Sequence, residues 1–133
     1  MALMFLNGGG MRGGPVHRHI EGVPLVGERR TAPQYRFYSI RDEYPGLYPA
    51  DRARMDGQPI AGELYDVPMD LLRSLLANEP PELELSIVEL ESQQLSFGMI
   101  LRDEEQRRGG HTDITRYGGW RAYRAARTGP DGA

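Results

Sequence analysis

Apolar residues along this chain fall into short runs and alternating stretches, which predict β-strands more often than helices. Residues 2–6 form an apolar run of strand length, and residues 60–67 form a second one that is rich in β-prone residues. Residues 24–40 alternate in part between polar and apolar positions. A break in that stretch at Thr31-Ala32-Pro33 predicts two strands that are joined at a bend.

Two other segments carry the signals of helices. Pro68 opens a segment in which four leucines form one apolar stripe, and Pro80-Pro81 ends it. A shorter helix is expected between Pro15 and Ile20, because a proline suits the first turn of a helix.

The C-terminal part of the chain, residues 113–127, carries large apolar residues at spacings of three. These residues are Ile114, Tyr117, Trp120 and Tyr123. The spacing predicts a helical segment that is interrupted at Gly118-Gly119. Because aromatic side chains dominate core burial, we expect this segment to dock on the domain rather than to form a ligand site.

Three segments are predicted to lack regular structure. Residues 41–59 contain repeated proline and glycine turn signals. Residues 103–112 are expected to form a charged linker, and residues 128–133 a loose tail. Residues 1–127 are therefore expected to make one domain.

The remaining strand signal settles the predicted fold class. Residues 85–90 and 95–101 predict a hairpin around a polar turn. Because short turns join several strands, we expect a mostly antiparallel sheet of about five to seven strands, with two or three helices. The predicted fold class is α+β: a small, closed or partly closed β-barrel that is flanked by helices.

Composition excludes several kinds of chemistry. The chain has 133 residues, of which 39% are hydrophobic and 26% charged, enough for one packed core. It has no cysteine, so disulfides, thiolate metal sites and a cysteine nucleophile are excluded. All sixteen residues counted as lysine or arginine are arginine, which excludes a Schiff base. We expect no cofactor.

The charge and hydropathy of the chain limit which partners are expected. The net charge is -3, and arginines alternate with acids along the chain, so nucleic acid is not an expected partner. The N-terminal apolar stretch has no basic leader and is far shorter than a membrane span. We therefore expect a cytoplasmic protein that does not bind membranes.

The candidate binding site follows the first apolar run, where five of the seven residues at positions 8–14 are glycine. Such a loop needs either positive φ angles or the close approach of another group to bare backbone. Two interpretations are open, a ligand loop and a simple connection between elements. In a ligand loop, backbone N–H groups would bind a carboxylate or stabilise an oxyanion. The candidate binding residues are Asn7, Gly8, Gly9, Gly10 and Met11.

The three histidines do not indicate a metal site. His17 and His19 are two positions apart, so they do not share one face of a helix, and no third ligand lies nearby in sequence. His111 lies beside two glycines and is expected to be exposed to solvent.

Several motifs together resemble a known family. The first twenty residues, MALMFLNGGGMRGGPVHRHI, resemble the start of the gamma-glutamyl cyclotransferase-like superfamily, in which a substrate loop follows the first strand. Within that superfamily the closer likeness is to the C-terminal domain of allophanate hydrolase, and it covers about residues 3–102. The segments that carry it are 8–15, 31–38, 45–47, 60–65 and 80–83.

The resemblance implies a small β-barrel with a ligand cavity at the end of the first strand. It places Glu79 at the position of the cyclotransferase general base, and Gly46 and Leu47 among the substrate-binding residues. It also implies a structural hydrogen bond for His17. The end of a helix and burial would both raise the pKa of Glu79, as a base requires. The alternative for Glu79 is a solvated side chain at a helix end.

Two functions follow from the resemblance. The first is a small-molecule enzyme in which Glu79 acts as the general base that cyclises a γ-glutamyl amine, or a related amide, to 5-oxoproline. The second is a standalone homologue of the allophanate hydrolase C-terminal domain. Such a domain would bind or process a ureido carboxylate, or act as a noncatalytic partner of an amidase. The expected partners are a small molecule with a carboxylate or amide, and either an amidase or further copies of the chain.

Overall fold

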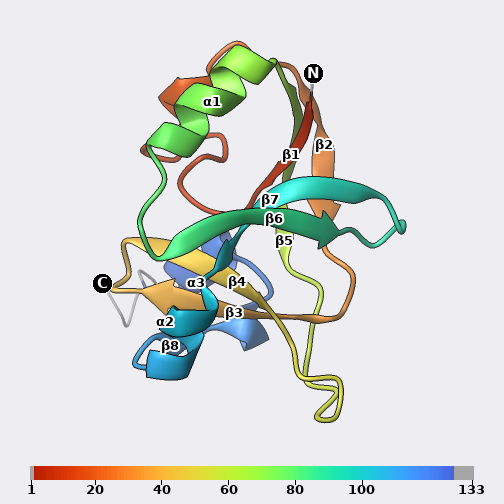
Figure 1. Cartoon of the computed structure of the whole chain (residues 1–133), viewed down its shortest axis with the longest axis vertical. Coiled ribbons are helices and arrows are strands. Elements are labelled where there is room, and N and C mark those ends of the chain that lie inside the picture. Colours follow the sequence, from red (N-terminus) through yellow and green to blue (C-terminus); the bar gives the residue numbers. More distant parts are fainter. Residues whose placement is uncertain (1, 128–133) are drawn as a thin grey trace.

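The computed structural model describes residues 2–127, which form one mostly antiparallel sheet with short helices around it (Figure 1). The strands are β1 (Ala2–Leu6), β2 (Leu25–Arg30), β3 (Tyr35–Ile40), β4 (Tyr44–Pro49), β5 (Ala61–Val67), β6 (Leu83–Glu89), β7 (Leu95–Leu101) and β8 (Thr112–Asp113). The helices are α1 (Met69–Ala77), α2 (Asp103–Arg108) and α3 (Trp120–Arg127), with 3-10 turns η1 (His17–Ile20) and η2 (Thr115–Tyr117).

Strand β1 lies inside the sheet, between β5 and β7. The strand order is β2-β5-β1-β7-β4-β3-β8, and β6 pairs with β7 outside this path. The pairs β1–β7 and β4–β7 are parallel and the others are antiparallel. Because β1 has a neighbour on each side, the glycine-rich loop leaves the sheet from a fixed point.

The predicted α+β class and the mostly antiparallel pairing are confirmed. The predicted barrel is not closed. Strands β2 and β8 stand at opposite ends of the strand order and do not pair with each other within residues 2–127. The sheet also has eight strands, more than the pattern predicts, since β4 and the two-residue β8 carry no clear strand signal in the sequence.

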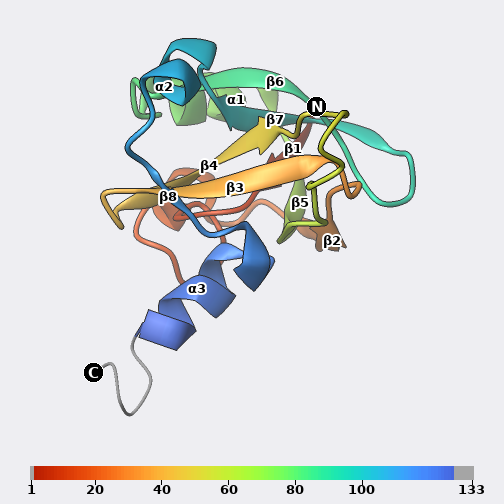
Figure 2. The same ribbon diagram turned by 90° about the horizontal axis from the view of Figure 1, so that it is seen from below.

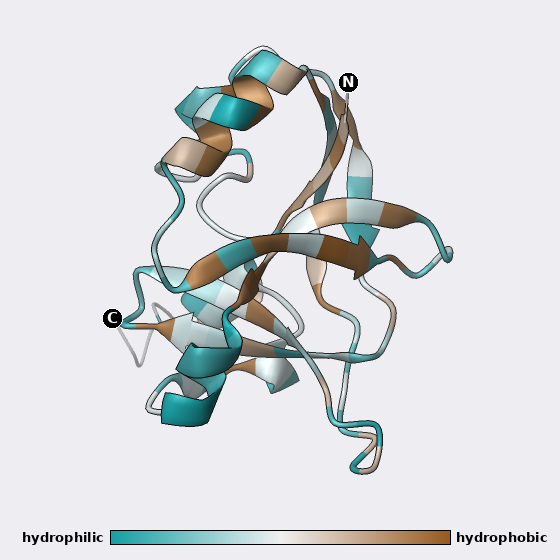
Figure 3. Cartoon of the chain, viewed as in Figure 1, coloured by the Kyte–Doolittle hydropathy of each residue, from teal (hydrophilic) through white to brown (hydrophobic). Residues whose placement is uncertain are grey.

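The main core lies around β1 and β5. Met4 and Phe5 of β1 and Leu64 and Tyr65 of β5 are at most 1% exposed, and Leu72 of α1 packs on the same cluster. Figure 3 shows hydrophobic residues concentrated on β1, β6, β7 and one face of α1. Each such side chain contributes about 1.5–3 kcal/mol by its burial, which fixes the end of β1 from which the site is built.

The prediction of an irregular segment over residues 41–59 is wrong for β4. Six residues of β4 pair with β3, from Tyr35↔Pro49 to Ile40↔Tyr44, and Leu47 pairs with Ile100 of β7. Pairing on both sides overrides the turn propensity of the prolines and glycine in this segment. Strand β4 and the β3–β4 hairpin therefore provide one wall of the candidate site that is described below.

The prediction of a linker over residues 103–112 is wrong for its first six residues, which form α2. Three acidic residues occupy the first turn of this helix and two arginines the last, which suits the helix dipole. Gly109, with φ 72°, ends the helix. In Figure 2, α2 lies on one side of the strands and α3 on the opposite side.

The C-terminal segment packs on the main core, and Gly118 separates its two helical parts. Ile114 is 0% exposed, and Trp120 and Tyr123 are each 7% exposed. Gly118 adopts a left-handed conformation between η2 and α3. The tail expected at residues 128–133 lies outside the described residues. None of the helices within residues 2–127 is long and apolar enough to cross a membrane.

Candidate functional site

The end of β1 opens into a cavity of about 150 Å³. Three segments form its walls: the start of the glycine-rich loop, the residues after α1 that include Glu79, and the end of the β3–β4 hairpin. This volume equals the share of about five water molecules in the liquid, so the cavity fits a small polar group.

The structure brings most of the predicted site residues together. Asn7, Gly8, Gly9, Gly10 and Glu79 all line this cavity, although Glu79 is about seventy positions away from the loop in the sequence.

Three of the predicted binding residues do not line this cavity. Met11 is 4% exposed and packs in the main core. Leu47 is 0% exposed, and Gly46 faces the side chains of the smaller apolar cluster. Pro45, at the start of β4, contributes to the cavity wall instead.

The glycine-rich loop is folded by its own backbone. The N–H of Met11 donates to the carbonyl of Gly8 at 3.1 Å, and the N–H of Val16 donates to the carbonyl of Gly9 at 3.0 Å. The N–H groups of Gly8, Gly9 and Gly10 have no acceptor within residues 2–127. Three consecutive amides thus have no acceptor in the described chain, as a ligand loop requires, whereas the amide of Met11 is already used.

Gly8 is required because the backbone lies against Pro45. A Cβ added at Gly8 would lie 2.6 Å from Cδ of Pro45, closer than side chains approach one another. We expect Gly8→Ala to displace Pro45, to narrow the cavity and to weaken ligand binding in it at least tenfold. Gly9→Ala should cost less, because its Cβ would meet the nearest atoms at 3.4 Å. Thermal unfolding of both variants would separate a blocked cavity from a destabilised fold, and equal ligand affinities of the two variants would contradict this account.

Glu79 follows the end of α1 and is partly buried. Its carboxylate has no hydrogen bond or ion pair within the part of the chain that the structure describes. Burial raises the pKa of Glu79 to about 7. The raised pKa that the sequence predicts is thus present, and burial of the side chain is its cause.

Glu79→Gln is expected to stabilise the fold above neutral pH. The pKa of Glu79 is higher in the folded chain, so its favourable contribution is complete below pH 4.5 and disappears as the pH rises through about 7. At pH 8 the ionised side chain costs at most about 3 kcal/mol, which glutamine avoids. Urea unfolding at pH 8 and pH 4.5 tests this, with the exposed Glu21→Gln as the control. Equal stability of wild type and Glu79→Gln at pH 8 would contradict the expectation.

Glu63 on β5 is a fully buried carboxylate, 0% exposed, that holds the far end of the loop. It accepts hydrogen bonds from the backbone N–H and the Nε of Arg12, both at 2.8 Å. Tyr65 donates to it at 2.8 Å, and Nη2 of Arg121 at 3.2 Å. Burial opposes ionisation, but these donors outweigh it and lower the pKa of Glu63 to about 2. Sequence analysis misses Glu63, because a single glutamate in a strand pattern indicates a solvent-facing position.

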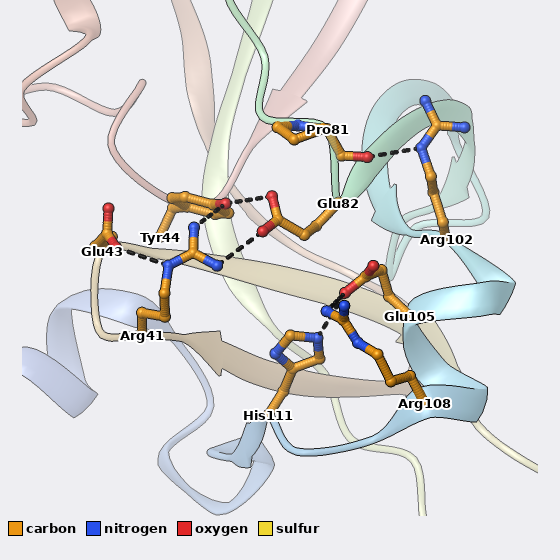
Figure 4. Close-up of polar contacts among 9 residues, drawn as sticks. All are labelled: Arg41, Glu43, Tyr44, Pro81, Glu82, Arg102, Glu105, Arg108 and His111. Atoms are coloured by element: carbon orange, nitrogen blue, oxygen red, sulfur yellow. Dashed lines mark hydrogen bonds and ion pairs between the residues drawn. The ribbon is translucent and has the colours of Figure 1, made fainter.

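A second polar cluster holds the residues that follow Glu79 (Figure 4). Glu82 is 9% exposed and accepts hydrogen bonds from the hydroxyl of Tyr44 and from Nη1 of Arg41. These bonds lower the pKa of Glu82 to about 2, and burial with the Glu82 contact raises the pKa of Tyr44 to about 12. Because Tyr44 also lines the cavity, the cluster fixes the hairpin against the segment that carries Glu79.

The histidines divide into two groups. Nδ1 of His17 lies 2.9 Å from the carbonyl of Gly10, which confirms its structural hydrogen bond, and His19 lines the cavity. The prediction for His111 is wrong: its side chain is 10% exposed, and its Nε2 lies 3.1 Å from Glu105 (Figure 4). Helix α2, which the sequence does not predict, supplies that partner. Residues 2–127 contain no group of three histidine or carboxylate side chains that could hold a metal ion.

The chain belongs to a known class of domain. Residues 2–125 match the allophanate hydrolase C-terminal domain, and the chain belongs to this family. Over 120 residues it is 32% identical to the urea amidolyase of Saccharomyces cerevisiae, a match that covers 87% of this chain and 6% of that protein. The chain thus spans a small part of this curated relative.

Solved structures agree with this assignment. A uropathogenic E. coli-specific protein superposes with a TM-score of 0.84 and 28% identity, over 93% of this chain and 95% of that one. The urea amidolyase of Kluyveromyces lactis gives a TM-score of 0.86 and 25% identity, over 96% of this chain and 8% of that one. An AIG2-like protein from Mus musculus shares the fold, with a TM-score of 0.55, 22% identity and 76% coverage of each chain. The predicted resemblance is confirmed.

Proposed function

We propose that the cavity at the end of β1 is the active site of a small-molecule enzyme of the γ-glutamyl cyclotransferase type. The observation that carries the proposal is that Glu79 lines the same small cavity as Gly8, Gly9 and Gly10, whose N–H groups have no acceptor within residues 2–127. A proton acceptor with a pKa near the working pH and a set of backbone donors are the two groups that such a reaction needs.

The proposed reaction begins with the α-amine of a γ-glutamyl amine. The ionised carboxylate of Glu79 takes a proton from this amine, whose nitrogen then attacks the γ-carbonyl carbon. The N–H groups of the glycine-rich loop stabilise the oxyanion that forms, or bind the substrate carboxylate. The carbon–nitrogen bond to the leaving amine breaks, and Glu79 returns its proton to that amine. The products are 5-oxoproline and the free amine.

Burial of Glu79 supports its role as a base. A solvated glutamate would have a pKa near 4.5, too weak a base to accept a proton from an amine at neutral pH. With a pKa of about 7, Glu79 is about half ionised at pH 7 and holds a transferred proton more strongly. The absence of an ion pair at its carboxylate within residues 2–127 leaves that carboxylate free to contact a substrate.

Family membership favours a second candidate function. The family is that of the allophanate hydrolase C-terminal domain, and the matched region is a small part of multidomain urea amidolyases. The same cavity and loop amides would then bind a ureido carboxylate, alone or beside an amidase partner. A change at Glu79 distinguishes the two functions. Cyclisation requires proton transfer by Glu79, whereas binding of a carboxylate does not.

The experiment that tests the proposal is release of 5-oxoproline by the purified chain. The panel contains γ-glutamyl amines, γ-glutamyl amino acids and glutathione, and Glu79→Gln serves as the control. Release that depends on Glu79 supports the cyclotransferase. If wild type and Glu79→Gln release equal amounts, the proposal is wrong for this panel. Calorimetric titration of both proteins with allophanate would then test the second candidate.

A further inference from the structure

Four of the residues that line the cavity at the end of β1 have side chains that can gain or lose a proton. They are His19, Glu43, Tyr44 and Glu79. Titratable groups that share a cavity are the first candidates for catalytic residues. The proposed reaction assigns a role to Glu79 alone.

Two of these four side chains are already engaged with their neighbours (Figure 4). Nε of Arg41 donates to the carboxylate of Glu43 at 2.8 Å, and Nη2 of Arg41 donates to the hydroxyl of Tyr44 at 2.8 Å. The hydroxyl of Tyr44 in turn donates to Glu82, and burial together with that contact raises the pKa of Tyr44 to about 12. Glu43 is thus held in an ion pair and Tyr44 keeps its proton near neutral pH, so neither is suited to exchange protons with a substrate.

His19 has no such partner. Its imidazole makes no hydrogen bond, ion pair or ring contact within residues 2–127, and the residue is partly buried. His17 differs, because its Nδ1 lies 2.9 Å from the carbonyl of Gly10. Imidazole is the side chain that most often gives and takes protons near neutral pH. The cavity is therefore lined by two proton carriers without partners in the described chain, the carboxylate of Glu79 and the imidazole of His19.

The backbone around His19 is fixed to the glycine-rich loop and to α1. The N–H of His19 donates to the carbonyl of Val16 at 3.2 Å, and the N–H of Val16 donates to the carbonyl of Gly9 at 3.0 Å. Ile20 is 0% exposed, and η1 packs against α1, the helix that Glu79 follows. Because the cavity has a volume of only about 150 Å³, we expect one substrate amide in it to contact both His19 and Glu79.

The proposed cyclisation has to move two protons. At neutral pH the α-amine of a γ-glutamyl amine is an ammonium group with three hydrogens, and the ring nitrogen of 5-oxoproline keeps one of them. The leaving nitrogen starts with one hydrogen and departs as an ammonium group with three. Glu79 takes and returns one proton, so the other needs a second carrier.

We propose that His19 is this second carrier, a catalytic residue that moves a proton from the attacking nitrogen to the leaving nitrogen. The inference rests on the proposed cyclotransferase function. After Glu79 has taken the first proton and the amine has attacked the γ-carbonyl carbon, the neutral imidazole takes the second proton from the ring nitrogen. It gives that proton to the leaving nitrogen as the carbon–nitrogen bond breaks. Glu79 then gives the first proton to the released amine, so both side chains end as they began.

Two substrates of nearly the same shape test this role. The γ-glutamyl amides of ethylamine and of trifluoroethylamine differ only in fluorine atoms, which withdraw electrons and make the leaving nitrogen less basic. That nitrogen departs with less help from a proton carrier. We expect His19→Gln to lower kcat for 5-oxoproline release at least about 100-fold for the ethylamide, but less than about tenfold for the trifluoroethylamide.

His17→Gln provides the matched control. His17 holds the glycine-rich loop through Gly10, so its loss should slow both amides by the same factor. Glu79→Gln should also slow both, because the base acts before the leaving group departs. The ratio of the two rates within one variant does not depend on the fraction of folded protein. His19→Asn is a second variant with the same expected ratio, and circular dichroism checks the fold of each.

The possible failures are distinguishable. If the wild type releases 5-oxoproline from neither amide, the proposed function and this inference both fail. If release depends on Glu79 but His19→Gln leaves it unchanged, this inference alone is wrong and water carries the second proton. Equal losses on the two amides would also overturn it, because they would assign a structural role to His19.

Discussion

Glu79→Gln is expected to reduce 5-oxoproline release by a factor of about 10²–10⁴, the usual contribution of a general base. Glutamine fills nearly the same volume and keeps the cavity closed, but it cannot accept a proton. The loss should therefore appear mainly in kcat. Steady-state kinetics on the best substrate of the panel provides the measurement.

The pH profile of the wild type should report the same group. The base must be ionised, so kcat/KM should rise with pH below about 7 and level off above it. The direction follows from burial, which holds the proton on Glu79 until the pH approaches 7. At pH 6 only about one tenth of the chains would carry the active carboxylate.

Two further variants separate proton transfer from other effects. Glu79→Asp keeps the carboxylate but withdraws it by one methylene, and a displacement of about 1 Å can cost about 100-fold. Glu21→Gln removes an exposed glutamate after η1 and should leave the rate unchanged. If Glu79→Gln retains more than one tenth of the wild-type kcat, another group is the base.

Glu63→Gln should have the largest effect on stability, a loss of about 3 kcal/mol. Glu63 is completely buried, and four donors from Arg12, Tyr65 and Arg121 converge on its carboxylate. Removing one partner of a buried charge pair typically costs 3–5 kcal/mol, and the lower end applies because both arginine side chains are about half exposed. The corresponding fall in melting temperature is about 10 °C.

The effect of Glu63→Gln should depend on pH in the opposite sense to that of Glu79→Gln. The pKa of Glu63 is lower in the folded chain, so its stabilising contribution is present above pH 4.5 and is lost as the pH falls toward 2. Urea unfolding followed by the fluorescence of Trp120 provides the measurement. The difference from wild type should be full at pH 7 and much smaller near pH 2.

Glu91→Gln provides the matched control. Glu91 also pairs with an arginine, Arg30, at 2.7 Å, but both side chains are about half exposed. A surface pair of this kind contributes at most about 1 kcal/mol. If Glu63→Gln and Glu91→Gln lower the free energy of unfolding equally, burial of Glu63 does not strengthen its contribution to stability.

Much of the fold follows from local periodicity in the sequence. Strands β1 and β5, helix α1 and the β6–β7 hairpin appear where the pattern predicts them, because each buries one face or one stripe of apolar residues. The break at Gly118 can also be predicted from the sequence, because glycine favours the left-handed conformation that it adopts there. The resemblance of several motifs identifies the family and points to Glu79 and the loop from Asn7 to Gly10.

Other features depend on partners that are distant in the chain. Strand β4 exists because β3 and β7 pair with it, although Pro45, Gly46 and Pro49 favour turns when considered alone. His111 is covered because helix α2 brings Glu105 to it.

The sequence by itself determined the class of fold, the family and the two halves of the candidate site. Only the tertiary structure decided which residues meet there: Pro45 lines the cavity in place of Gly46 and Leu47, and burial raises the pKa of Glu79. The tertiary structure also decided that Glu63 is ionised in the interior, because its donors come from a loop and a helix about fifty positions away on either side. Periodicity in the sequence indicates which face of a helix or strand is buried. How deeply a charged side chain is buried, and which residues pair with it, depend on contacts between distant segments.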